Sequence, residues 1–208
     1  MKYDGVIFDL DGTLWDSGIS VADSWNETLA ELGFEEPRYT EEDIHSVMGL
    51  AEPQIAEKLF PAFGSRSREI CALCLAREVI YVRSHGGILY PGVEELLKRL
   101  RGRCGVFIVS NCQAGYIDAF LDFCGFRELV ASYACAGENG RSKGENIRLI
   151  AESFGLKDPV YVGDTVWDQR SAAEAGCAFI HAAYGFGAAE GTVMRADTPL
   201  KILDHLNF

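Results

Sequence analysis

The 208-residue sequence contains no apolar run close to the roughly 20 residues that span a bilayer. Its first apolar run is interrupted by Asp4, Asp9 and Asp11, which makes it a poor signal peptide. Positive charge is scarce too, because 19 Lys and Arg residues stand against 31 Asp and Glu residues, for a formal net charge of −12. This charge repels a phosphate backbone and no basic patch offsets it, so we expect no nucleic-acid partner. Since no apolar run is long enough to span a bilayer, we expect no membrane partner either.

A disulfide framework is also missing. The 7 cysteines are odd in number and irregularly spaced, which is typical of free thiols in a reducing compartment, and we therefore expect a cytoplasmic protein. Cys71 and Cys74 form a C-x-x-C, but they lie inside the helical pattern REICALCLAREVIYV, and no second Cys or His pair stands at zinc spacing. Buried helix packing is therefore favoured over metal or redox use.

Short strands that look buried recur along the chain. These apolar runs, each ending in polar or glycine residues, cover 3–9, 105–111, 159–165 and 177–185, with a weaker one at 132–138. Amphipathic helical patterns lie between them at 92–101, 115–126 and 144–156. The alternation predicts an α/β fold with a doubly wound, mostly parallel, Rossmann-like sheet.

Residues 16–84 break this alternation, because they carry helical signals and no convincing strand. The expected helices begin at Ser20-x-x-Asp23, at Thr40-x-x-Asp43, near Pro53 and at residue 66. We therefore predict an inserted all-helical domain over residues 16–84, between the two parts of a core formed by 1–15 and 85–208. Hinges are expected near 15–20 and 84–90.

The main functional signal lies where the strands end. Ligands of doubly wound sheets bind at the carboxyl ends of the strands, and Asp9, Ser110 and Asp164 fall at such ends. Asp9 and Asp11 stand at i and i+2, so their side chains share one side of an extended chain. Such a pair can hold a metal, can supply a nucleophile toward phosphorus with a proton-transfer partner, or can be a solvated strand end.

Other polar residues fit the same chemistry. Asp164 and Asp168 could supply oxygen ligands or support for a metal, and Ser110 with nearby N–H groups could hold phosphate oxygens. Lys143 precedes a helical pattern and provides a point positive charge. Taken singly, each also has an ordinary role as a helix cap, a turn residue or a surface lysine.

The ordered set DLDGTL, VSN, an isolated lysine and GDTVWD resembles the haloacid dehalogenase-like hydrolases. Within them it looks like the phosphoglycolate phosphatase-like branch, whose helical cap follows the first motif, and the resemblance covers essentially the whole chain. It implies a Mg²⁺-dependent phosphatase that hydrolyses a small phosphorylated metabolite, a phosphate monoester, through an aspartyl-phosphate intermediate.

The resemblance also implies roles for individual residues. Asp9 would be the nucleophile and a Mg²⁺ ligand, and Asp11 would be the general acid/base and a ligand through its carbonyl. Asp164 would complete the metal ligands, and Asp168 would hold Lys143 or a metal-bound water.

The same resemblance implies a phosphate site. Ser110 and the N–H of Asn111 would bind the transferring phosphoryl group, and Lys143 would neutralise charge on the nucleophile and the phosphate. Gly144 departs from the pattern, because many relatives have proline after this lysine, and we expect an altered loop with the charge unchanged.

Several alternatives remain open. The acid at position 11 favours phosphoryl transfer over dehalogenation, since a leaving halide needs no proton. Lys58 is the only lysine between 15 and 90 and its register is that of an exposed helix position, which disfavours phosphonate cleavage through a Schiff base. A sugar-phosphate mutase similar to beta-phosphoglucomutase would share the core machinery, and a non-catalytic binding protein is a third class.

The residues that set specificity are expected in the cap. An anionic substrate could meet Lys58, Arg66, Arg68, Arg77 or Arg83, although a solvated helix face is favoured for each. Trp15 and Trp167 are expected to form a hydrophobic wall under the cap or in the core, in preference to stacking on substrate. The identity of the ester, the closure of the cap and the oligomeric state are left open.

Overall fold

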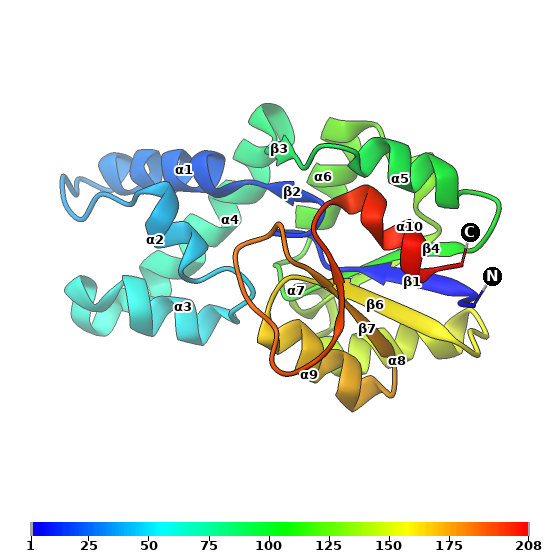
Figure 1. The fold of residues 1–208 in the computed structure, drawn as a ribbon. Coiled ribbons are helices and arrows are strands. Elements are labelled where there is room, and N and C mark those ends of the chain that lie inside the picture. The colour runs from blue at the N-terminus through cyan, green and yellow to red at the C-terminus, as the bar shows by residue number, and fades with distance from the viewer. Residues whose placement is uncertain (1, 208) are drawn as a thin grey trace.

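The structure, a computed structural model that describes residues 2–207, has the expected α/β architecture (Figure 1). Its main sheet has six parallel strands in the order β5-β4-β1-β6-β7-β8. The strands are β1 (Gly5–Phe8), β4 (Gly105–Ser110), β5 (Ser132–Cys135), β6 (Pro159–Gly163), β7 (Ala178–Ala182) and β8 (Met194–Ala196). The five strands expected from apolar runs are therefore confirmed, whereas β8 was not expected.

β1 occupies the centre of the sheet because its residues can be buried on both faces. All four residues of this strand are buried. Val6 lies in register with Val106 of β4 and Val160 of β6, while Ile7 faces the opposite side and packs in a second apolar cluster. Continuous apolar strands of this kind are typical of parallel sheets that are covered on both faces.

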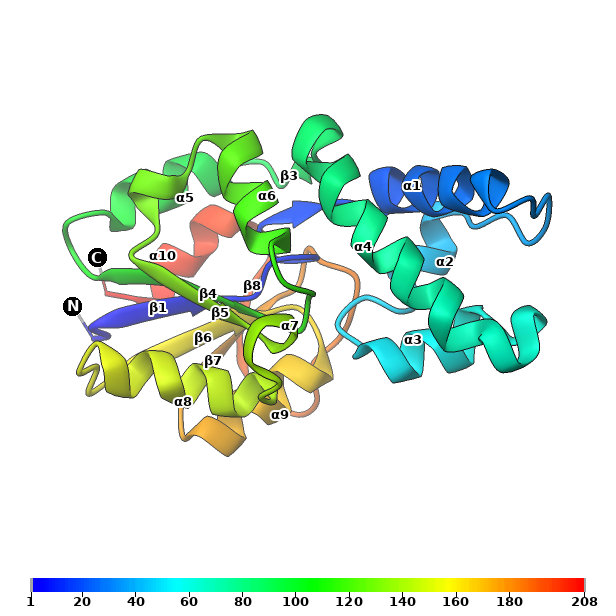
Figure 2. The ribbon, with the colours of Figure 1, turned by 180° about the vertical axis from the view of Figure 1, so that it is seen from behind.

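Helices cover the two faces of the sheet, as Figure 2 shows. One face carries α5 (Val93–Leu100), α6 (Tyr116–Cys124) and α10 (Ile202–His205), and the other carries α8 (Lys143–Ser153) and α9 (Val166–Ala175). The expected helices at 92–101, 115–126 and 144–156 are thus confirmed. The remaining short elements are α7 (Ala136–Asn139), η1 (Pro61–Arg66), η2 (Arg127–Leu129) and η3 (Pro199–Lys201).

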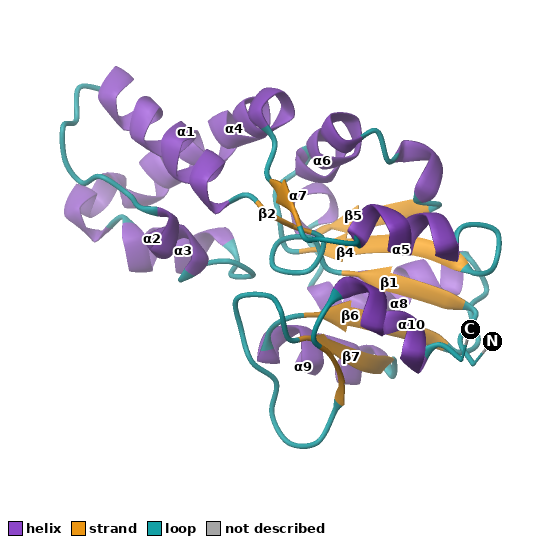
Figure 3. Cartoon of the chain, turned by 45° about the horizontal axis from the view of Figure 1, so that its top comes forward, coloured by secondary structure: helices purple, strands orange, loops and turns teal. Residues whose placement is uncertain are grey.

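Four helices gather beyond the carboxyl end of the sheet (Figure 3). They are α1 (Gly18–Glu31), α2 (Glu41–His45), α3 (Glu52–Leu59) and α4 (Ser67–His85), and residues 18–85 are called the helical insertion below. The expected capping box of Thr40 and Asp43 is present at α2, and Cys71 and Cys74 are buried within α4 as expected. Whether the insertion is a separate domain with its own hinges stays a prediction.

The expected start of α1 at Ser20 is wrong. The helix begins at Gly18, because the Asp16 carboxylate accepts the Gly18 N–H at 2.9 Å and the Ser17 carbonyl accepts the Val21 N–H at 2.9 Å. The side-chain hydrogen-bond acceptor for the first turn of the helix is therefore Asp16, which precedes the helix. Ser20 lies inside the helix.

A small antiparallel pair of strands joins the insertion to the core, and no sequence pattern predicted it. β2 (Trp15–Asp16) pairs with β3 (Ile88–Leu89), so the chain enters and leaves the insertion through adjacent strands. Gly87 permits this approach, since a Cβ there would lie 2.6 Å from the Asp16 carbonyl oxygen. Within residues 2–207, no helix combines the length and the apolar character needed to cross a membrane.

Candidate active site

The carboxyl end of the sheet brings acidic side chains together from distant parts of the chain. Asp9 directly follows β1, and Asp164 directly follows β6, the neighbouring strand. Carboxylate oxygens of Asp9, Asp164 and Asp168 all lie within 4.8 Å of one another, and all three residues are buried. The grouping expected at this edge of the sheet is therefore present.

Lys143 is the first residue of α8 and reaches into this acidic group. Ser142 caps the helix in a capping box with Glu145, which fixes the backbone that carries the lysine. The Lys143 ammonium donates to Asp9 Oδ1 at 2.9 Å and to Asp168 Oδ1 at 2.6 Å. Burial alone would lower the pKa of Lys143, but the Asp168 and Asp9 carboxylates outweigh it and hold the pKa above its ordinary value.

Asp168 uses both of its carboxylate oxygens on protein partners. Oδ1 accepts from Lys143, and Oδ2 accepts the backbone N–H of Thr165 at 3.0 Å and its hydroxyl at 2.7 Å. Asp168 therefore caps α9 and anchors Lys143 at the same time. The contact with Lys143 is one of the two expected for Asp168, and its place relative to a metal stays a prediction.

Asp164 is arranged differently, because one of its oxygens is left without a partner. Oδ2 accepts the N–H groups of Phe186 at 2.9 Å and Gly187 at 3.2 Å, whereas the buried Oδ1 has no hydrogen bond. Burial, followed by repulsion from Asp168, raises the pKa of Asp164 to about 7. Glycine is required nearby, since a Cβ at Gly12, where φ is +81°, would lie 2.5 Å from the Asp164 carboxylate.

A divalent cation fits this group of residues. The buried carboxylates of Asp9, Asp164 and Asp168 outnumber the single ammonium of Lys143, and Asp164 Oδ1 is an unpaired acceptor in a buried place. Oxygen ligands of this kind suit Mg²⁺. Asp9 and Asp164 are the side chains that would hold it.

Asp11 is held by a network that sequence reasoning missed. Its Oδ1 accepts from Trp15 Nε1 at 2.9 Å, from the Ser17 hydroxyl at 2.7 Å and from the Tyr116 hydroxyl at 3.1 Å. Burial raises the pKa of Asp11 to about 6, although these hydrogen bonds oppose the shift. Trp15 is fully buried, as expected for a wall residue, and it also helps to fix the orientation of Asp11.

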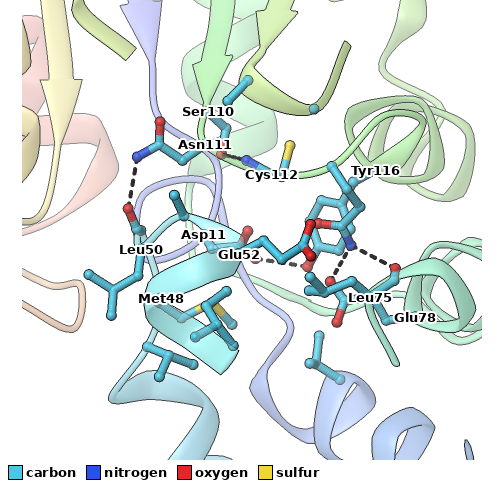
Figure 4. Close-up of a pocket in the computed structure, with 18 of the residues that line it drawn as sticks. Asp11, Met48, Leu50, Glu52, Leu75, Glu78, Ser110, Asn111, Cys112 and Tyr116 are labelled. Atoms are coloured by element: carbon cyan, nitrogen blue, oxygen red, sulfur yellow. Dashed lines mark hydrogen bonds between the residues drawn. The ribbon is translucent and has the colours of Figure 1, made fainter. Parts of the chain in front are cut away.

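Ser110 and Asn111 lie at the end of β4, facing the helical insertion (Figure 4). The Ser110 hydroxyl accepts the N–H of Cys112 at 3.4 Å. The Asn111 side-chain amide donates to the Gly49 carbonyl at 2.8 Å, which ties the core to the insertion. The phosphate contacts predicted for the Ser110 hydroxyl and the Asn111 backbone N–H stay predictions.

A cavity of about 280 Å³ lies between the core and the insertion. Asp9, Asp11, Ser110 and Asn111 line its core side, and Figure 4 shows Met48 and Leu50 across from Ser110 and Asn111. Glu78 and Gln113 also line it, and no motif pointed to either of them.

The basic residues that were weighed as specificity determinants lie elsewhere. None of Lys58, Arg66, Arg68, Arg77 and Arg83 lines this cavity, in line with the favoured view of them as solvated residues. Arg66 pairs with Glu69 on the insertion surface, for example. Trp167 is about half exposed (49%) and lines a groove together with Leu50 of the insertion, so of the two expected places, under the cap or in the core, the core is excluded.

The sequence can also be compared with known proteins. The family model of the haloacid dehalogenase-like hydrolases matches residues 3–176. A protein of Pseudomonas aeruginosa named 5′-nucleotidase is 29% identical over 206 residues, which cover 96% of this chain and 90% of that protein. A protein of Pseudomonas syringae named phosphoglycolate phosphatase is 26% identical, with 97% of this chain and 76% of that protein covered.

Solved structures show the same fold. The crystal structure of a protein of Haemophilus somnus, described as a predicted phosphoglycolate phosphatase, superposes with a TM-score of 0.82. The alignment covers 99% of each chain at 21% sequence identity, so this likeness is one of fold.

Proposed function

The chain belongs to the haloacid dehalogenase-like hydrolases, and from that membership we propose that it is a Mg²⁺-dependent phosphatase that hydrolyses a small phosphate monoester through an aspartyl-phosphate. The observation that carries the proposal is the different treatment of two neighbouring carboxylates. Asp9 is held by the Lys143 ammonium, whereas Asp11 is held by three neutral donors and has a pKa of about 6. Burial raises the pKa of Asp9, and the Lys143 ammonium opposes that shift by pairing with the ionised carboxylate, the form that a nucleophile needs. The environment of Asp11 suits a group that gives and takes protons.

In the first half of the reaction, an Asp9 oxygen attacks phosphorus and the bond from phosphorus to the leaving oxygen breaks. Asp11 gives its proton to that oxygen, so that a neutral alcohol departs. Ser110 and the Asn111 N–H would bind the phosphoryl oxygens, and Lys143 would offset their charge. Mg²⁺, bound by Asp9, Asp164 and the Asp11 carbonyl, would supply charge neutralisation that lets a carboxylate approach a phosphate dianion.

In the second half, Asp11 is ionised and accepts a proton from water. That water attacks phosphorus, the Asp9–phosphorus bond breaks, and inorganic phosphate leaves with Asp9 restored. The triple hydrogen bond on Oδ1 holds the Asp11 carboxyl in one orientation for both steps.

The names of similar proteins support a small phosphorylated metabolite as the substrate. The relatives described above are named 5′-nucleotidase and phosphoglycolate phosphatase, and both names denote hydrolysis of a phosphate monoester. The helical insertion is proposed to act as a cap over the site, since it supplies one wall of the cavity. We also infer a cytoplasmic location, in keeping with seven cysteines that are all free of disulfides.

The proposal is tested by phosphate release from a panel of esters with Mg²⁺ present. Asp9→Asn is expected to abolish release, because an amide cannot form the aspartyl-phosphate. Asp23→Asn, an exposed change on α1, is the matched control and is expected to retain activity. Unchanged turnover in Asp9→Asn would refute the nucleophile assignment.

The same panel separates the other function classes. Conversion of one sugar phosphate into another without phosphate release would identify a mutase. Binding of an ester with no turnover of any ester would identify a binding protein.

A further inference from the structure

The charged residues that line the cavity between core and insertion are all acidic. Its charged lining residues within the described chain are Asp9, Asp11, Glu52 and Glu78, and none is Lys, Arg or His. The nearby Lys143 ammonium is already shared between Asp9 and Asp168. The leaving group of an ester bound in this cavity would therefore contact no positively charged side chain of the cavity wall. The cations proposed for the site act on the phosphate instead.

The rest of the insertion wall is largely aliphatic. The aliphatic residues that it contributes are Val21, Ile44, Val47, Leu50, Ile55 and Leu75. A carboxylate placed against such a wall loses its hydration and gains no partner, which is costly. An uncharged group with an apolar part is stabilised there by burial.

Glu78 supplies a buried acceptor in this wall. It lies on α4, is 5% exposed, and accepts from Trp25 Nε1 through one oxygen and from Gln113 Nε2 through the other. Gln113 also donates to the Leu75 carbonyl at 3.0 Å, so it is fixed in place. Each carboxylate oxygen can accept more than one hydrogen bond, which leaves acceptor capacity for a hydroxyl or amino group of a ligand.

We propose that Glu78 selects phosphate monoesters whose leaving alcohol is uncharged and bears a hydroxyl or amino donor, and rejects those whose leaving alcohol bears a carboxylate. The proposal rests on the phosphatase function proposed above and specifies its substrate class. When Glu78 is ionised, a donor group pairs with it, whereas a carboxylate meets a second negative charge with no cation between them.

A neighbouring groove is the competing place for an anionic group. It runs past Lys143, and its other charged lining residues are Arg141, Arg170 and Glu174 of the core. Arg170 is paired with Glu190 at 3.2 Å. A substrate that used this groove would prefer a carboxylate, so the two sites predict opposite selectivity.

Matched esters that differ only in a CH₂OH or a carboxylate test the proposal. One pair is 2-hydroxyethyl phosphate and 2-phosphoglycolate, and a longer pair is sorbitol 6-phosphate and 6-phosphogluconate. Assays with Mg²⁺ at pH 8.5 keep Glu78 mostly ionised, because its pKa is raised by burial to about 8. For the better pair, we expect kcat/KM of the uncharged ester to exceed that of its carboxylate partner about tenfold.

Two variants assign that preference to the cavity wall. Glu78→Gln keeps the shape and removes the charge, and it is expected to lower the ratio severalfold, while the exposed Glu27→Gln of α1 leaves the ratio unchanged. Met48→Arg places a cation on the wall and is expected to shift the ratio toward the carboxylate ester. Thermal unfolding of each variant confirms that the protein is folded.

The outcomes separate the two proposals. Equal or better turnover of the carboxylate esters by the wild-type protein would overturn the selection and favour the groove, with the phosphatase function intact. If Glu78→Gln lowers kcat/KM for both members of a pair by the same factor, then Glu78 has only a structural role and its assignment is overturned. No phosphate release from any ester, including 4-nitrophenyl phosphate, would overturn the phosphatase function itself.

Discussion

The Lys143 ammonium lies 2.9 Å from Asp9 Oδ1, across 134 residues of sequence, and the two side chains are only 3% and 5% exposed. A pair buried to this degree depends on each partner, because removing one leaves the other charged and without compensation. The contact therefore links the proposed chemistry to the stability of the fold.

Lys143→Met is expected to lower the free energy of unfolding by about 3–5 kcal/mol, since Asp9 and Asp168 would both lose their cation. Urea unfolding at pH 7 without added metal measures this change. Lys98→Met is the matched control, because Lys98 is exposed on α5 and pairs with Glu94 on the surface, and its effect is expected within about 0.5 kcal/mol. Equal effects of the two changes would contradict the structural role of Lys143.

Asp11→Asn is expected to slow turnover of alkyl phosphates by a factor of about 10² to 10⁴, because both the leaving alcohol and the attacking water lose their proton partner. With 4-nitrophenyl phosphate the leaving group needs no proton, so the first step survives and the second becomes slow. Rapid-mixing measurements should then show a burst of 4-nitrophenol equal to the enzyme concentration. Equal losses on both kinds of ester, with no burst, would contradict the assignment.

Asp164→Asn is expected to remove most of the stabilisation by Mg²⁺. In the wild-type protein, Mg²⁺ at 100 times its dissociation constant should add about 2.7 kcal/mol to the free energy of unfolding, and EDTA should reverse the gain. Without metal the variant should be at least as stable as the wild-type protein, because an amide oxygen still accepts from Phe186 and Gly187 and the charge of Asp164 is gone. Thermal melts with and without Mg²⁺ measure both effects, and equal Mg²⁺ shifts in the two proteins would refute the ligand assignment.

Glu78 should make the stability depend on pH. Burial raises its pKa from 4.5 to about 8, so between these values the folded state binds a proton that the unfolded state has lost. Its contribution is fully present below pH 4.5 and is lost as the pH rises through 8. In Glu78→Gln, the free energy of unfolding should decrease less as the pH rises. The difference between the wild-type and variant free energies of unfolding should therefore change by a few kcal/mol between pH 4.5 and 8.

Urea unfolding at a series of pH values from 4.5 to 8.5, with Mg²⁺ held constant, measures that difference. Glu27→Gln is again the control, since Glu27 is exposed. A difference curve for Glu78→Gln that does not change with pH would contradict the buried state of this carboxyl.

The strands of the sheet could be predicted because their signals are local. Residues 106–109, for example, are all apolar, and they are buried on both faces of a parallel sheet. β8 (Met194–Ala196) gave no such signal because it is a short edge strand with a single fully buried residue. The β2–β3 pair was missed for a related reason, since two-residue strands carry no periodicity.

The site was predicted in part. Asp9, Ser110 and Asp164 were placed by their positions at strand ends, which local patterns determine. The partners of Asp11 depend on folding, because Tyr116 is 105 residues away and approaches only when α6 packs on the sheet. Glu78 and Gln113 meet across 35 residues between the insertion and the core, and neither stands in a motif.

The paired strands β2 and β3 have a consequence for how such proteins diversify. Trp15 lies opposite Leu89, so the two ends of the insertion are neighbours and a tight turn could join them. Replacing the segment between them would exchange most of the aliphatic wall and Glu78 while leaving Asp9, Asp11, Lys143 and Asp164 in place. In the proposed assignment, reactivity and selectivity are encoded in separate stretches of the gene, so recombination at two points would give the same chemistry a new substrate.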